Sequence, residues 1–101
     1  MEGVLRQETM HKIDFAGEIP DYCSTGPSLR CAAKVDGSPA TYEITAEALE
    51  DHFGARSYRN EDLLPAFMSN RQDIERVAGA LFEMTGAQHI VLHSGHFRFA
   101  V

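Results

Sequence analysis

Residues 29–45 decide the fold, and they read LRCAAKVDGSPATYEIT. Apolar and polar residues alternate on both sides of Asp36-Gly37. This dipeptide favours a type I′ turn, because both central residues of that turn need a positive φ. With the turn placed there, Cys31 faces Tyr42, and the later cross-strand pairs on the same face are also largely apolar. The pattern predicts an antiparallel hairpin with one buried face.

The residues before this hairpin predict one short strand and a loop. Ile13 and Phe15 alternate with polar neighbours, as in a strand with one apolar face. Residues 17–28 contain two glycines and two prolines, so we expect a connecting loop there. Residues 1–10 show neither a helical nor a strand period, and we expect a frayed terminus.

A short helix is expected directly after the hairpin. The Thr45 side chain can accept hydrogen bonds from the free amides of a helix start. Ala46, Leu49 and Phe53 then share one face by their spacing of three and four residues. Gly54 can adopt the left-handed conformation that ends a helix. The sequence therefore predicts a helix between Thr45 and Gly54.

A second, longer helix is expected from Asp62 onward. Asp62 can cap its start, which would place Pro65 in the first turn, where a missing amide costs little. Thr85-Gly86 supplies the end of the helix. Its apolar stripe consists of Phe67, Ile74, Val77, Ala78, Leu81 and Phe82.

Asn70 and Arg71 interrupt this apolar stripe, and a kink or restart of the helix is expected there. Polar groups on an apolar face must be paired, be exposed or line a pocket. One interpretation is a ligand-binding site at Asn70 and Arg71. The simpler alternative is an ion pair of Arg71 with Asp51 or Glu75 at the kink.

The tail, residues 88–101, alternates again around Ser94-Gly95 and predicts a second two-residue hairpin. The register of this hairpin would pair Leu92 with Phe97 and Ile90 with Phe99. The expected fold is therefore α+β. It has an antiparallel sheet built from two hairpins and a short N-terminal strand, packed by a short and a long helix.

Composition sets the class of protein. The chain has 101 residues, 44% of them hydrophobic, which is enough for a single domain over residues 1–101. Cys23 and Cys31 match no zinc spacing, so we expect reduced thiols in a cytoplasmic protein. No stretch is long and apolar enough for a membrane span. A net charge of −6 disfavours nucleic acid as a partner, except through a group of arginines at positions 56, 59, 71 and 76.

Taken together, the pattern resembles the DUF1488 family of small bacterial domains of unknown function. The residues that carry the resemblance are Ile13, Phe15, Val35-Asp36-Gly37, Tyr42 to Thr45, Ala48 to Gly54, Phe67, Arg71, Ile74, Glu75 and Ile90 to Phe97. The resemblance implies an α+β fold with an antiparallel sheet packed by helices. It implies no activity.

Candidate chemistry is sparse. In the second hairpin His93 and His96 would be cross-strand neighbours, with Cβ atoms about 5 Å apart, close enough to share a metal ion. That pair is two ligands short of a closed zinc site. Burial on the apolar face would make Cys31 an inert thiol rather than a nucleophile. Catalytic and nucleotide-binding signatures are missing from the sequence, so no cofactor is expected.

Three functions remain open at this point. The leading expectation is a non-catalytic binding or accessory domain. The alternatives are a small metal-binding protein or hydrolase that uses His93 and His96, and a nucleic-acid accessory protein. A homodimer through an exposed strand edge is a separate expectation, because the outer strands of the sheet must be paired or protected.

Overall fold

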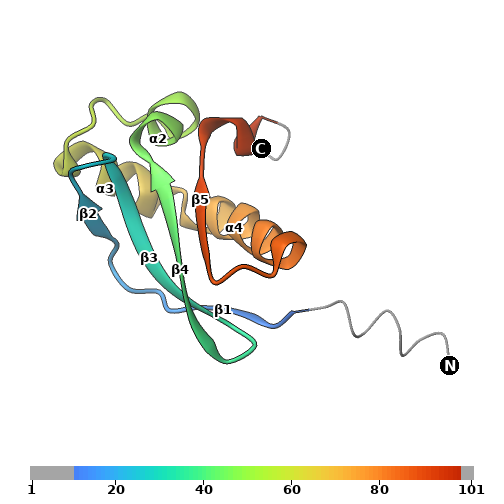
Figure 1. Ribbon diagram of the computed structural model, residues 1–101. Helices are drawn as coiled ribbons and strands as arrows, with labels where there is room; N and C mark the ends of the chain where they lie inside the picture. The colour runs from blue at the N-terminus through green and yellow to red at the C-terminus, as the bar shows by residue number, and fades with distance from the viewer. Residues whose placement is uncertain (1–10, 99–101) are drawn as a thin grey trace, which may run out of the picture.

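The computed structural model describes residues 11–98, which form one mixed sheet and three α-helices (Figure 1). The elements in chain order are β1 (Ile13–Phe15), β2 (Asp21–Cys23), β3 (Ser28–Val35), β4 (Ser38–Thr45), α2 (Ala46–Phe53), α3 (Asn60–Ser69), α4 (Arg71–Thr85), β5 (His89–Leu92) and the 3₁₀ helix η1 (Ser94–Phe97). The expected frayed terminus, residues 1–10, and the expected partner Phe99 lie outside the described residues.

The β3–β4 hairpin has the predicted turn and register. Asp36 and Gly37 have φ values of 53° and 84°, as a type I′ turn requires. Cys31 faces Tyr42 across the two strands. Pro39 lies in the part of β4 that precedes the pairing with β5, which begins at Thr41. Its missing amide is therefore at a sheet edge, as is typical of proline in strands.

The segment before the hairpin is more ordered than expected. β1 is present as predicted and pairs antiparallel with β3. The predicted loop over residues 17–28 is wrong in part, because Asp21–Cys23 forms β2 and also pairs with β3. β1 and β2 occupy successive parts of the same edge of β3. Gly17 and Pro20 lie between β1 and β2, and Gly26-Pro27 lies between β2 and β3, so these residues occupy the connections and do not keep the whole segment out of the sheet.

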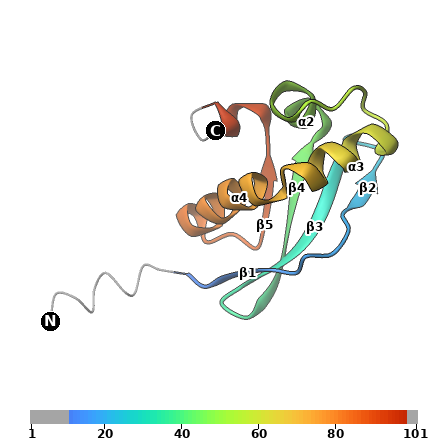
Figure 2. The same ribbon diagram turned by 180° about the vertical axis from the view of Figure 1, so that it is seen from behind.

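The helices cover one face of the sheet. Figure 2 shows α3 and α4 in front of the strands, whereas Figure 1 shows the strands in front of these helices. Helix α2 follows β4 directly and begins as predicted, since Ala48 N–H donates to Thr45 Oγ1 over 3.1 Å. It ends at Gly54, which has φ 78°. The other face of β3 and β4 carries no helix in the described part of the chain.

The predicted long helix is two helices. Asn70, with φ −125° and ψ 22°, ends α3 and precedes α4, so the chain restarts at the expected interruption. The predicted cap at Asp62 is wrong, because α3 already begins at Asn60, after Arg59. Pro65 therefore lies inside α3 and not in its first turn. The predicted end of α4 is confirmed by Gly86 in the left-handed conformation.

The prediction of a second hairpin is wrong, and the sheet is mixed instead of antiparallel. β5 pairs in parallel with β4, in the register Thr41↔His89 to Ile44↔Leu92. After β5 the chain turns into η1 instead of returning as a strand. His93 N–H donates to His96 Nδ1 over 2.8 Å, a local bond that competes with strand pairing. Leu92 and Phe97 are therefore not cross-strand partners.

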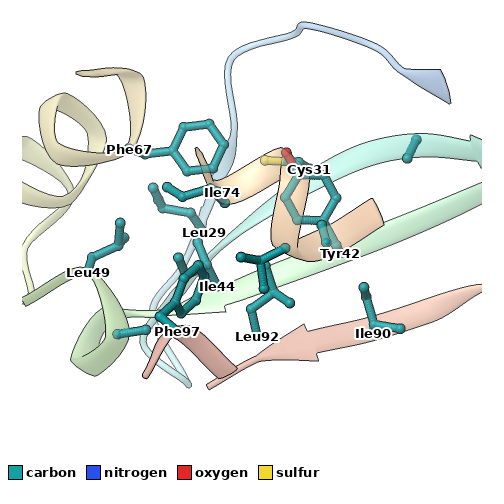
Figure 3. Packing of buried hydrophobic residues seen from close by; sticks show 14 of the residues in the cluster. Leu29, Cys31, Tyr42, Ile44, Leu49, Phe67, Ile74, Ile90, Leu92 and Phe97 are labelled. Atoms are coloured by element: carbon teal, nitrogen blue, oxygen red, sulfur yellow. The ribbon is translucent and has the colours of Figure 1, made fainter. Parts of the chain in front are cut away.

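The core lies between the sheet and the helices. Figure 3 shows side chains from β3, β4, β5, α2, α3, α4 and η1 meeting in one cluster. Phe97 is fully buried, and its ring stands edge-on to Phe53 with centroids 5.2 Å apart. The end of the described chain therefore contributes Phe97 to the core, through a 3₁₀ turn and not a strand.

Candidate functional site

The helix break at Asn70 and Arg71 is an internally paired site. Arg71 Nε donates to Glu75 Oε2 over 2.9 Å, and these side chains are only 16% and 22% exposed. The Arg71 guanidinium also lies 5.2 Å from the centre of the Phe67 ring. Asn70 Nδ2 donates to the carbonyl of Ala66. Both predicted ligand-binding residues thus have partners within the fold, and the Glu75 pair is the simpler of the two interpretations of Arg71.

Cys31 and Tyr42 form a buried polar pair on the covered face of the sheet. They are cross-strand partners, and Figure 3 shows the Cys31 sulfur beside the Tyr42 oxygen. Burial raises the pKa of the Cys31 thiol to about 11, and burial likewise raises the pKa of the Tyr42 phenol. A thiol with such a pKa carries little thiolate at neutral pH and is a poor nucleophile. The arrangement supports the prediction that Cys31 is inert.

His93 and His96 are neighbours as expected, but because His93 directly precedes η1 and His96 lies within it, and not through hairpin pairing. Their ring centres are 5.9 Å apart. His96 Nδ1 already accepts the His93 backbone N–H, which leaves His96 Nε2 and the His93 ring for any other ligand. Within residues 11–98 no third His, Cys, Asp or Glu joins them in a group that could hold a metal ion. The metal site at His93 and His96 stays a prediction.

His52, Ser94 and Asp51 bring together the residue types of a nucleophilic site, with His52 Nε2 3.1 Å from Ser94 Oγ, but the hydroxyl proton of Ser94 is directed to Asp51 and not to His52. Ser94 Oγ donates to Asp51 Oδ2 over 2.6 Å. His52 Nε2 lies 3.0 Å from the Ser94 carbonyl oxygen, which can only accept a hydrogen bond. His52 Nε2 is therefore the donor and cannot take a proton from the Ser94 hydroxyl. These contacts tie α2 to η1.

A polar network lies on the open face of the sheet. Glu43 accepts hydrogen bonds from Ser28 Oγ over 2.8 Å and from Arg30 Nη2 over 3.2 Å. His89 joins it from β5, with Nδ1 2.6 Å from Thr41 Oγ1 and Nε2 3.4 Å from Glu43 Oε2. Alternation along β3 and β4 places Arg30 and Glu43 on one face, but His89 enters only through the parallel pairing of β5.

The charge state of this network follows from Glu43. Burial alone would raise the pKa of Glu43, but the hydrogen bonds from Ser28 and Arg30 and the positive charge of Arg30 outweigh burial and lower it. The carboxylate is therefore ionised and already held by two donors. The distance of 3.4 Å to His89 is longer than a good N–H···O hydrogen bond. The network fits a stabilised sheet face better than a reactive triad.

The outer edge of β5 is free of strand partners within the described chain. Thr41 N–H donates to the Gln88 carbonyl over 2.9 Å. Backbone groups alternate in direction along a strand, so Ile90 faces β4 while the N–H and C=O groups of His89 and Val91 face outward. Among residues 11–98, β5 pairs with β4 alone. Such an edge can accept a further strand.

A hollow adjoins this edge, and we call it the edge groove. It has a volume of about 370 Å³ and is lined by Arg76, Val77, Ala80, Leu81 and Met84 of α4 and by His96 of η1. Figures 1 and 2 both show η1 and the C-terminal part of α4 beside the outer edge of β5, which is the edge that points away from β4. Met84, which lines this groove, is 79% exposed. The sequence analysis assigned Val77 and Leu81 to the core stripe and gave no indication of the groove.

The arginines proposed for nucleic acid do not form a free basic face. Three of the four pair with acidic side chains: Arg59 with Glu61, Arg71 with Glu75 and Arg76 with Asp73. These pairs leave less positive charge for phosphate groups. None of the helices in residues 11–98 is long and apolar enough to cross a membrane.

Comparison with known proteins agrees with this architecture. The family model described as "Protein of unknown function (DUF1488)" matches residues 13–92. The chain belongs to the DUF1488 family. A crystal structure of a DUF1488 protein of unknown function from Shewanella loihica PV-4 superposes with a TM-score of 0.70 and 23% sequence identity, covering 79% of this chain and 90% of the other. That likeness concerns the fold. No curated protein matches.

Proposed function

We propose that this DUF1488 domain is a non-catalytic protein-binding domain of the cytoplasm that accepts a partner strand at the free edge of β5. The observation that carries the proposal is the outward backbone of His89 and Val91 beside the apolar edge groove. Strand addition gains affinity from main-chain hydrogen bonds and specificity from pockets for alternate side chains. The sheet edge and the groove supply both.

The remaining polar clusters support the same proposal. The histidine beside Ser94 acts as a hydrogen-bond donor, the Glu43 carboxylate is held by two donors, and the thiol of Cys31 is buried. Each cluster is therefore engaged in holding the fold. The cytoplasmic assignment is supported by Cys23 and Cys31, which are both free thiols.

Site-specific photo-crosslinking in cells that express the protein tests the proposal. A photo-reactive amino acid at Val91 is expected to form an adduct with a protein of discrete mass, because Val91 lies in the edge strand. The same amino acid at Ala32, which is exposed on the same face but in the interior strand β3, is the matched control. Equal adducts at both positions, or none at Val91, would overturn strand addition at β5.

Metal binding by His93 and His96 remains a second proposal. The 5.9 Å separation of their ring centres is the observation that favours it. Two histidines give a weak, open site, and further ligands would have to come from water or from another chain. A metal titration on histidine variants tests it and is described in the Discussion.

A further inference from the structure

We infer that the partner at the edge of β5 is a second copy of this chain, related by a twofold axis; this inference rests on the proposed function. A peptide strand alone would pair with β5 but leave the exposed face of α4 uncovered. A second copy brings a strand and a helix together, because α4 leads into β5 through the short connection 86–88. The edge strand and the edge groove would thus be occupied at the same time.

The backbone of β5 allows one symmetric register centred on Ile90. Only His89 and Val91 direct their N–H and C=O groups outward, and the next amide, that of His93, is bound to His96 Nδ1. In an antiparallel pair, His89 of each copy would therefore lie opposite Val91 of the other and exchange both hydrogen bonds with it. The two sheets would join into one continuous sheet across the axis.

The same symmetry places the exposed face of α4 against the same face of α4 in the other copy. Both helices lie on the same face of the joined sheet, and the twofold axis makes them antiparallel. The inference places this axis between Ala80 and Leu81, so that Met84 of one copy lies opposite Val77 of the other, which is 8% exposed at the base of the groove. Met84, which is 79% exposed here, would then enter the groove of the second copy. The groove and the residue that fills it belong to one surface, so the surface is self-complementary.

Charge at the helix ends fits the antiparallel arrangement. The last turn of α4 contains no basic residue, so its terminal carbonyl groups, at Thr85, have no cation from their own helix. In the dimer Arg76 of one copy lies opposite Thr85 of the other. A cation at a helix C-terminus interacts favourably with the helix dipole. The Arg76 side chain is 61% exposed, and its pair with Asp73, itself 47% exposed, leaves the guanidinium within reach of a second partner.

Sedimentation equilibrium of the full chain, from micromolar to millimolar protein, tests the second copy. The chain is expected to dimerise, and Met84→Lys is expected to raise the dimer Kd by at least about tenfold, because it places a charge in an apolar groove at the centre of the interface. Met68→Lys, the same change at an exposed methionine of α3, is the matched control. We expect its Kd to stay within about twofold of the unchanged chain.

A mixed disulfide experiment tests the register. On a Cys23→Ser background, chains with His89→Cys and chains with Val91→Cys are oxidised alone and as a mixture. Opposed residues of a hydrogen-bonded pair lie about 5.5 Å apart at Cα, within disulfide range. Identical residues are two positions apart along the strands and exceed that range. Crosslinked dimers are expected only in the mixture.

The outcomes separate the inference from the proposed function. A monomer at all concentrations, a dimer insensitive to Met84→Lys, or crosslinking in the unmixed samples alone would overturn the twofold dimer. Photo-adducts from Val91 to a different protein would then still support strand addition. Absence of any adduct at Val91 would overturn the proposed function itself.

Discussion

Truncation of Phe97 to alanine is expected to destabilise the protein strongly. The Phe97 side chain is fully buried, and its ring packs edge-on against Phe53. The centres of the Phe97 and His52 rings are 5.8 Å apart. Burial of a phenylalanine contributes about 1.5–3 kcal/mol. An edge-to-face aromatic pair adds about 0.5–1.5 kcal/mol. With the cavity that remains, we expect Phe97→Ala to lower the free energy of unfolding by about 3–5 kcal/mol.

Urea denaturation followed by circular dichroism measures this loss, and thermal unfolding should show a fall in Tm of at least about 12 °C for a domain of this size. Tyr22→Ala is the matched aromatic control, because Tyr22 is 39% exposed on β2. Its loss should be less than half that of Phe97→Ala. A loss below about 1 kcal/mol for Phe97→Ala would refute the view that η1 is anchored in the core.

Three further predictions concern titratable groups. With a thiol-reactive disulfide reagent at mildly alkaline pH, Cys23 is expected to react readily, whereas Cys31 should react only after unfolding, because burial holds its pKa at about 11. Glu43→Gln should reduce the free energy of unfolding at neutral pH but not at acid pH. A carboxylate whose pKa is lowered by folding contributes stability above its unfolded-state pKa, and that contribution is lost as the pH falls through the folded-state pKa. Zn²⁺ should raise the thermal midpoint if His93 and His96 bind it, and His93→Ala should abolish the rise.

Each of these predictions has a contradicting result. Reaction of both thiols at the same rate in the folded protein would show that Cys31 is accessible. Equal losses for Glu43→Gln at acid and neutral pH would mean that the side chain acts through packing and not through charge. A zinc-dependent rise that survives His93→Ala would place the metal elsewhere.

The first hairpin could be predicted from sequence because its signals are local. Asp36-Gly37 fixes both the turn and the register, and strict alternation then assigns every side chain to a face. The cap at Thr45 and the end at Gly54 are equally local, since each depends on contacts within a few residues. The interruption at Asn70 was also visible, because it breaks the helical period.

The tail could not be predicted from the same kind of signal. Alternation at residues 89–92 correctly indicates a strand with Ile90 and Leu92 buried, but it does not state the direction of the neighbouring strand. The partner, β4, lies far back in the chain, with His89 and Thr41 separated by 48 positions. Ser94-Gly95 has the composition of a hairpin turn, yet the His93–His96 bond and the burial of Phe97 favour a 3₁₀ turn. Tertiary packing decided between two local conformations.

The candidate site was predicted only in part for the same reason. Asn70 and Arg71 were recognisable as polar residues in an apolar stripe, and their internal partners were close in sequence. The network around Glu43 and the edge groove depend on where β5 lies. The sequence predicts β5 as one strand of a hairpin, so the outer edge of β5 is expected to pair with the second strand of that hairpin. For this reason the sequence does not reveal the edge as free.

The parallel pairing of β4 with β5 has a consequence for the way the chain folds. The β3–β4 hairpin can close as soon as residues 28–45 exist, whereas β5 can add only after the three helices that precede it have been synthesised. Contacts between distant segments form slowly, because a long loop must be closed before they contribute. During that interval the edge of β4 that finally receives β5 is bare, with Tyr42 and Ile44 uncovered. A nascent or partly unfolded chain would therefore be most vulnerable to aggregation at β4 and not at the strand that is exposed in the finished fold.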